Sequence, residues 1–153
     1  MIEIVRETLV PAGAEEIWAV VAEPAEAAKW YALADRVVVV DGDGPGQRRR
    51  QYGYWGRRRS EVDQEIIRWE PPRRLVWQHL AERLDGKPAP RLARRTEFAI
   101  ELEPRGAQTL VRLRSRQEPA GPLRGILIRL AGKRFVTAGM TRSLNRLRAL
   151  FEA

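Results

Sequence analysis

The feature that most constrains the fold is a change of hydrophobic period near residue 118. From residue 36 to residue 117, short segments alternate apolar and polar residues, a pattern typical of β-strands with one buried face. After Pro119 and Pro122, apolar residues recur at helical spacing to the end of the chain. The pattern predicts an antiparallel sheet followed by one long C-terminal helix.

Seven strands and two short helices are expected before that final helix. A strand at residues 2–10 ends at Pro11, and helices follow at residues 14–22 and 25–31. The other strands are expected at residues 36–40, 47–55, 57–69, 75–82, 95–103 and 109–117. One stripe of the final helix is expected to face an apolar layer: Leu123, Leu127, Leu130, Met140, Leu144, Leu147 and Phe151. No repeat or linker is visible, so residues 1–153 are expected to form one domain.

Composition excludes several kinds of chemistry. The chain has no cysteine and one histidine, so it can form no disulfide, no thiolate metal site and no cluster of several histidines. Its 28 basic and 20 acidic residues give a net charge of +8, which raises nucleic acid or an anionic membrane surface as possible partners. Neither a signal peptide nor a spanning segment is recognisable, so we expect a cytoplasmic protein without a transmembrane segment.

Three phrases of the sequence carry a resemblance. They read VPAGAEEIWAVVAEPAEAAKW at residues 10–30, WEPPRRLVW at residues 69–77 and TRSLNRLRALFE at residues 141–152. In these phrases and in the order of its elements, the chain resembles the START-like SRPBCC superfamily, with the polyketide cyclase/dehydrase-type branch nearest in length and layout. The resemblance implies an α+β helix-grip fold, a curved seven-stranded antiparallel sheet wrapped around the C-terminal helix. It also implies a deep cavity between sheet and helix for a lipid, sterol, quinone, hormone or polyketide.

A ligand cavity needs apolar side chains to enclose the ligand and a few polar groups to orient it. Trp30 and Tyr31 are expected at the mouth of the cavity. The full set of ligand-binding candidates is Trp30, Tyr31, Gln51, Tyr52, Trp77, Phe98, Ile100, Met140 and Leu144. The competing interpretation is that the apolar members simply fill the core, because protein interiors are normally packed without voids.

Three side chains are candidates for catalysis: Arg49, Tyr54 and His79. Neighbouring residues of a strand face opposite sides, so the inward set is either Arg49 with Gln51 or Tyr52 with Tyr54, and the sequence leaves both open. An inward Arg49 could anchor a carboxylate or enolate, whereas the tyrosine phenols would act as donors. His79 could transfer protons in an enolisation or dehydration, or it could be a hydrogen-bonded core residue.

Charged residues dominate residues 48–65. The segment RRRQYGYWGRRR at residues 48–59 combines cations with aromatic rings, as an RNA-binding surface does. The carboxylates of Glu61, Asp63 and Glu65 are expected on the solvated face of the sheet, paired with Arg48 and Arg50. The arginine-rich segment has no RRM, KH or zinc-finger signature, and alternate arginines of a strand point to opposite faces, which makes nucleic acid an unlikely partner.

Three functional hypotheses follow. The first is binding of a hydrophobic or aromatic small molecule in the cavity, by a monomer or homodimer that needs neither a metal nor another cofactor. The second is a cofactor-independent polyketide aromatase/cyclase that uses the same cavity, where proximity supplies most of the rate. The third is a basic RNA-binding module, whose affinity would fall steeply with added salt.

Overall fold

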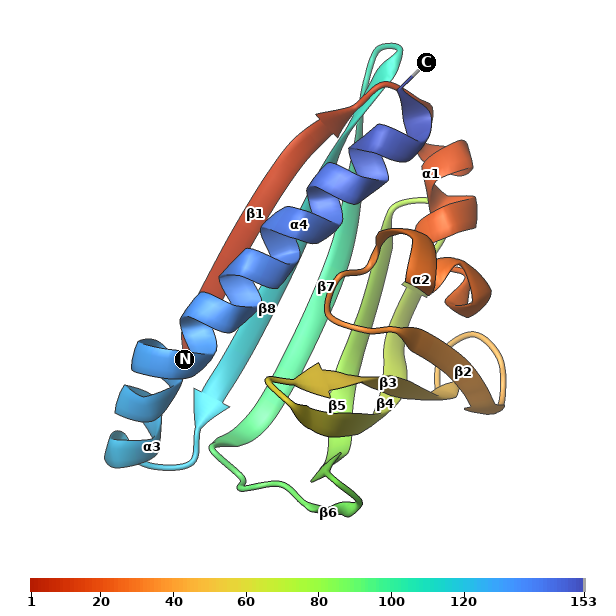
Figure 1. Cartoon of the computed structure of the whole chain (residues 1–153). Helices are drawn as coiled ribbons and strands as arrows, with labels where there is room; N and C mark the ends of the chain where they lie inside the picture. Colours follow the sequence, from red (N-terminus) through yellow and green to blue (C-terminus); the bar gives the residue numbers. More distant parts are fainter. Residues whose placement is uncertain (153) are drawn as a thin grey trace.

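All strands of the computed structural model, which describes residues 1–152, pair antiparallel in one curved sheet (Figure 1). The strand order is β1-β8-β7-β5-β4-β3-β2, and β6 pairs with β5 outside this path. The strands are β1 (Ile2–Val10), β2 (Arg36–Asp41), β3 (Arg48–Trp55), β4 (Arg58–Glu70), β5 (Arg74–Leu84), β6 (Lys87–Pro88), β7 (Ala93–Arg105) and β8 (Gln108–Pro119). The seven long strands were predicted, and β6 is an additional two-residue strand in the stretch expected to be an irregular connection.

Helices occupy the two places where the sequence period predicts them. Between β1 and β2 lie α1 (Ala14–Val21), the 3-10 turn η1 (Pro24–Glu26) and α2 (Ala27–Trp30). After β8, the chain forms α3 (Pro122–Leu127), the π-helical turn η2 (Ile128–Gly132) and α4 (Lys133–Phe151) without interruption. This arrangement confirms the α+β helix-grip fold. None of the helices in residues 1–152 is both long enough and apolar enough to cross a membrane.

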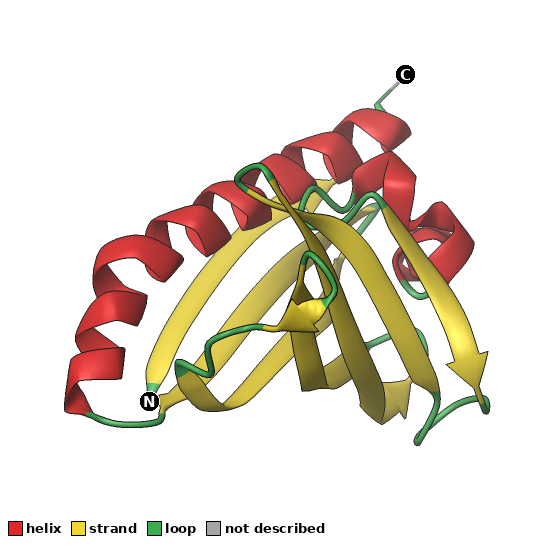
Figure 2. Cartoon of the chain, turned by 60° about the horizontal axis from the view of Figure 1, so that its bottom comes forward, coloured by secondary structure: helices red, strands yellow, loops and turns green. Residues whose placement is uncertain are grey.

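Helix α4 lies across the concave face of the sheet, over β1 and β8 (Figures 1 and 2). Its side chains Met140, Leu144 and Leu147 are buried there, as the helical stripe predicts. On the opposing strand β8, Val111 and Leu113 point into the same core because alternate residues of a strand face one side. Burial of this shared apolar face is the main force that holds helix and sheet together.

The connection between α2 and β2 is fastened to the middle of α4. The Ser143 hydroxyl accepts a hydrogen bond from the Ala32 amide at 2.8 Å and donates one to the Gly139 carbonyl at 2.7 Å. A Cβ atom at Gly139 would overlap the side chain of Leu33, so the glycine permits this close approach with Leu33 in its present position. The loop after α2 therefore has a fixed position beside α4.

The prediction of which side chains face the sheet is wrong for the first part of the final helix. Leu123, Leu127 and Leu130 are exposed rather than packed against the sheet. The inner face of this part passes through Gly125 and Ile128, both of which are buried. Glycine at position 125 permits the helix to lie against Pro119, and the π-helical turn changes the phase of the helix before α4 begins.

The convex face of β3, β4 and β5 carries the predicted ion pairs. Arg50 contacts Asp63 at 2.8 Å, Arg83 contacts Asp63 at 2.9 Å and Glu61 at 3.0 Å. Arg48 adds a longer contact with Glu65, at 3.9 Å. Hydrogen bonds from Arg83 and then Arg50 lower the pKa of Asp63 to about 2. Arg48 and Arg50 of the arginine-rich segment thus face carboxylates on the surface.

Candidate functional site

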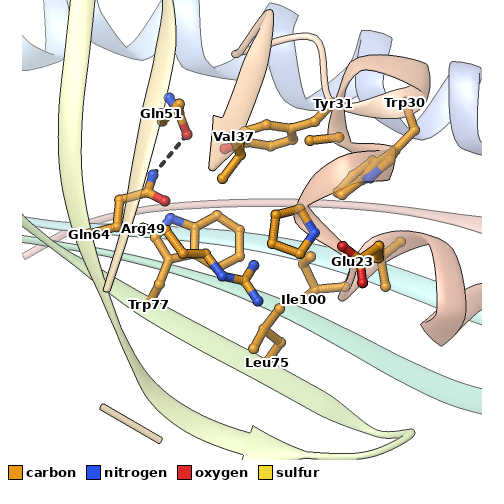
Figure 3. Close-up of a pocket in the computed structure, with 13 residues that line it drawn as sticks. Glu23, Trp30, Tyr31, Val37, Arg49, Gln51, Gln64, Leu75, Trp77 and Ile100 are labelled. Carbon is orange, nitrogen blue, oxygen red and sulfur yellow. Dashed lines mark hydrogen bonds between the residues drawn. The ribbon is translucent and has the colours of Figure 1, made fainter. Parts of the chain in front are cut away.

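The candidate site is a pocket between the short helices and the β2–β5 half of the sheet (Figure 3). Residues from α1, η1 and α2 form one side of it, and inward-facing residues of five strands form the other. Its lining comprises Val21, Glu23, Pro24, Ala27, Trp30, Tyr31, Val37, Arg49, Gln51, Gln64, Leu75, Trp77 and Ile100. Six of these were predicted as site residues: Trp30, Tyr31, Arg49, Gln51, Trp77 and Ile100.

The size and place of this pocket correct the expectation of a deep cavity against the C-terminal helix. The volume is about 30 Å³, far below the roughly 300–1,000 Å³ typical of small-molecule sites. No residue of α4 lines it. The reason is packing: Met140 and Leu144 fill the space between α4 and the sheet, and large aromatic rings fill much of the remainder. A ligand of ordinary size needs the pocket to widen.

Arg49 is the cationic centre of the pocket. Strand alternation turns it inward, where it is 7% exposed. Its Nε donates to the Gln47 side chain at 2.7 Å and its Nη2 donates to the Ala22 carbonyl at 3.1 Å, while the guanidinium lies 5.9 Å from the ring of Trp69. Burial lowers the pKa of Arg49 to about 10, an effect that the carboxylate of Glu23 opposes. The group therefore remains a cation at neutral pH.

Unlike the arginines of the convex face, Arg49 forms no ion pair with any carboxylate in residues 1–152. Burying a cation without a paired anion is costly, because the hydrogen bonds to Gln47 and Ala22 replace only part of its hydration. Glu23 also lines the pocket, yet its carboxylate accepts a hydrogen bond from the Ala25 amide at 3.2 Å rather than from Arg49. The pocket thus holds a buried cation without a contact ion pair, and the charge of Glu23 offsets it only from a distance.

Two glutamines form a polar edge beside Arg49. Gln64 donates through Nε2 to the side-chain oxygen of Gln51 at 2.8 Å, and Gln51 donates to the Leu33 carbonyl at 3.4 Å (Figure 3). Gln64 is directly opposite Arg49 in the pairing of β3 with β4. This chain of hydrogen bonds connects the pocket to the loop that is fastened to α4.

The pocket also contains buried donors that lack acceptors. The indole nitrogens of Trp30 and Trp77 are both inaccessible to solvent and have no hydrogen-bond partner in residues 1–152. Each such donor costs about 1–3 kcal/mol in lost hydration. Burial raises the pKa of the Tyr31 phenol well above its ordinary value, so this group stays protonated and can donate as well. The polar groups of the pocket are therefore biased towards donors.

Aromatic rings continue from the pocket into the sheet. Tyr31 lies 5.1 Å from Trp30 and 6.1 Å from Trp77 between ring centroids, and Trp77 stacks on Phe98 at 5.8 Å. His79 stacks on the same Phe98 ring at 5.3 Å. Phe98 and His79 thus extend the row of stacked rings beyond Trp77, and neither of them lines the pocket.

His79 has surroundings of its own. It occupies the same cross-strand row as Arg49, with Gln64 between them, so its backbone lies about 10 Å from that of Arg49. Its Nδ1 is 3.4 Å from the carboxylate of Glu82. Contact with His79 lowers the pKa of Glu82, and burial opposes this change. The structure therefore separates His79 from the cationic centre of the pocket.

The remaining predicted site residues lie elsewhere. Tyr52 is on the opposite face of β3, with the guanidinium of Arg36 stacked 4.4 Å from its ring, and Tyr54 is 56% exposed. Strand alternation explains both positions, because the inward set is Arg49 with Gln51. We therefore do not retain the tyrosines as pocket residues. Met140 and Leu144 are core residues of α4 outside the pocket.

Sequence reasoning missed two polar residues that line the pocket. Gln64 stands between Val62 and Ile66 in an inward-facing set, so a polar residue in an otherwise apolar alternation was the available signal. Glu23 follows α1 and precedes Pro24, and nothing in its local pattern distinguishes it from a surface residue. Residues 1–152 contain no cluster of three or more His, Cys, Asp or Glu side chains suited to a metal ion.

Comparison with known proteins supports the helix-grip fold over the whole chain. The family model described as "Polyketide cyclase / dehydrase and lipid transport" matches residues 1–152. We found no match among curated proteins.

Solved structures share this fold at low sequence identity. The protein TTHA0849 from Thermus thermophilus is similar with a TM-score of 0.75 and 18% identity, over 96% of this chain and 94% of that one. The di-domain ARO/CYC BexL from the BE-7585A biosynthetic pathway has a TM-score of 0.76 and 19% identity, over 97% of this chain and 46% of that one. The Aha1 dimer from Colwellia psychrerythraea has a TM-score of 0.71 and 17% identity, over 99% of this chain and 97% of that one.

Proposed function

Because the chain belongs to the polyketide cyclase / dehydrase and lipid transport family, we propose that it binds a small, largely aromatic molecule carrying an anionic oxygen in the pocket around Arg49. Apolar and aromatic side chains would enclose the ring system of the ligand. Arg49 would bind its anionic group, and the indole N–H groups of Trp30 and Trp77 would donate to its remaining oxygens.

One observation carries this proposal: a buried cation and two unpartnered indole donors line the same pocket. A buried donor without an acceptor destabilises the free protein, and an acceptor on a ligand recovers that free energy on binding. Hydrogen bonds to a charged group in a dry pocket are about twice as strong as neutral ones. The donors therefore favour an oxygen-rich anion over a plain hydrocarbon.

Ligand entry requires the pocket to widen from its volume of about 30 Å³. The short helix α2 ends at Trp30 and is followed directly by Tyr31, and both residues place large rings in the lining. A helix of four residues is held by its side-chain packing rather than by its own hydrogen bonds. We expect the Tyr31 ring to move outward and the ligand to take its place against Trp77 and Ile100, with the Trp30 indole remaining beside it.

A cyclase role is the alternative use of the same pocket. An aromatase reaction needs an enolate to be stabilised and protons to be moved. Arg49 could stabilise an enolate oxygen, and Glu23 is the other charged group of the lining. Two of the three predicted catalytic groups, Tyr54 and His79, lie outside the pocket, so the geometry favours binding over catalysis.

A matched pair of fluorescent probes tests the proposal. Anilinonaphthalene sulfonate and phenylnaphthylamine have the same ring system, but only the first is an anion. With Arg49→Met, we expect the Kd of the sulfonate to rise roughly 10- to 100-fold, the loss of charge-assisted hydrogen bonds. The Kd of the neutral probe should change by less than about threefold, because its contacts are apolar.

Two controls make this result specific. Arg48→Met removes a cation from the same strand but from the opposite face, and it should leave both Kd values unchanged. The titrations are repeated with Leu123 and Leu130 replaced by Gln, since exposed leucines could bind either probe on the surface. If Arg48→Met and Arg49→Met weaken sulfonate binding equally, the pocket is not the anion site.

A further inference from the structure

Helix α3 and the turn η2 expose a stripe of large apolar side chains to solvent. The apolar stripe consists of Leu123, Ile126, Leu127 and Leu130, which are 78%, 49%, 52% and 70% exposed. Their spacing of i, i+3, i+4 and i+7 places them on one face of a helix. The opposite face, through Gly125 and Ile128, already packs against the protein, so the stripe points away from it.

Cations surround the apolar stripe. Residues 119–151 contain no Asp or Glu, and their basic residues are Arg124, Arg129, Lys133, Arg134, Arg142, Arg146 and Arg148. Of these, only Arg148 forms an ion pair within residues 1–152, with Glu152. The first four are in or next to α3 and η2, and helical spacing places Arg124 and Arg129 on the two sides of the stripe.

The position of α3 makes the stripe accessible to a flat partner. Helix α3 lies beside the end of β8 at one edge of the molecule (Figure 1). Figure 2 shows the helical chain bending at this end and continuing past the strands. A surface at the edge of the molecule can approach a plane without interference from the sheet.

We propose that α3 and η2 bind the surface of an anionic lipid bilayer, with the apolar stripe inserted at the level of the headgroups. An interfacial helix combines an apolar face with flanking lysines and arginines, which is the arrangement found here. The four leucine and isoleucine side chains would leave water, and the nearby cations would neutralise lipid phosphates.

Charge favours this partner over two others. In a symmetric dimer the same surface faces its own copy, so the uncompensated cations would repel each other. Nucleic acid would attract the cations but would leave the apolar stripe in water. An anionic bilayer offers both negative charge and an apolar interior, so it alone of the three matches both halves of the surface.

Vesicle flotation tests the proposal with the full chain. The probes are vesicles of phosphatidylcholine alone and vesicles in which part of it is replaced by anionic phosphatidylglycerol. We expect wild-type protein to partition at least roughly tenfold more strongly onto the anionic vesicles. The double variant Leu123→Gln/Leu130→Gln should lower partitioning at least roughly tenfold on both, since two large apolar contacts are lost. The double variant Arg124→Gln/Arg129→Gln should lower it roughly tenfold on the anionic vesicles alone.

A matched variant separates this effect from a general loss of hydrophobicity. Leu9→Gln/Leu80→Gln removes two leucines of 42% and 40% exposure from strands far from α3 in sequence, and its partitioning should match that of wild type. Equal losses in the two leucine variants, or equal wild-type binding to both kinds of vesicle, would overturn the proposal. So would a concentration-dependent dimer in analytical ultracentrifugation that the Leu123→Gln/Leu130→Gln variant abolishes, because the stripe would then be a self-association surface.

Discussion

The two faces of the β3–β5 sheet use arginine in opposite ways. On the convex face, Arg83 has two carboxylate partners, and both lie in contact with solvent as well. On the concave face, Arg49 is more deeply buried and has no carboxylate partner in residues 1–152. A paired, partly exposed arginine stabilises the fold slightly and loses little hydration. Burying an arginine without a paired anion lowers the free energy of unfolding, so the needs of folding do not explain its presence. The difference favours the concave face as the ligand site, because an anionic ligand there would supply the partner that Arg49 lacks.

The largest expected effect on stability comes from removing the Trp77 ring, which lies on the same concave face as Arg49. Trp77→Ala should lower the free energy of unfolding by about 3–5 kcal/mol, because the ring contacts Tyr31 and Phe98 in the core. Trp77→Phe should cost less than about 1.5 kcal/mol, since the indole N–H that it removes has no partner. Urea denaturation measures both values. A Phe variant as unstable as the Ala variant would mean that the N–H group does make a stabilising bond.

Replacing Arg83 and Arg49 by methionine should affect the free energy of unfolding differently. Arg83→Met should lower the free energy of unfolding by about 1–2 kcal/mol, because Glu61 and Asp63 lose their shared partner. Arg49→Met should leave it unchanged or raise it by about 1 kcal/mol, because a buried charge without a contact ion pair is replaced by an apolar side chain. Thermal and urea unfolding of the two variants provide the measurement. Marked destabilisation by Arg49→Met would show that this side chain is structural, and the contrast between the faces would disappear.

The smallest effect is the contribution of Asp63, on the convex face, to the pH dependence of stability. The pKa of Asp63 is lowered from 3.8 to about 2, so the folded state favours its charged form. The stabilisation is therefore fully present above pH 3.8 and is lost as the pH falls towards about 2. After allowance for solvent screening it amounts to about 1 kcal/mol. Asp63→Asn should remove this part of the acid sensitivity, which urea midpoints at several acidic pH values would detect as a flatter profile.

Sequence patterns were sufficient for the fold because its alternations and breaks are local. The period-two segments and the proline and glycine turns define the seven long strands without knowledge of the partner strands. The strand β6 was missed because its two residues are too short for any period to show. The exposed stripe at Leu123, Leu127 and Leu130 was misassigned because helical spacing identifies an apolar face but not what covers it.

The site was predictable only in part. Aromatic composition led to Trp30, Tyr31 and Trp77, but the inward choice between Arg49 and Tyr54 depended on strand register, which is a long-range property. The small volume of the pocket depends on how rings from distant segments fill one space, and no local pattern encodes that. That Arg49 forms no contact ion pair with a carboxylate of residues 1–152 likewise became visible only when β3 was placed against its neighbours.

At the π-helical turn Ile128–Gly132, the helix can lose one residue while the parts on either side keep their orientation. Five residues of such a turn rotate the helix about as far as roughly four residues of ordinary α-helix. A chain that lacked one residue here could close the turn into regular helix while Gly125 and Met140 kept their present neighbours. A deletion within α4 would instead rotate everything before it by about 100° and expose buried side chains. Natural or engineered variation in helix length should therefore be tolerated at this turn and rejected a few residues later.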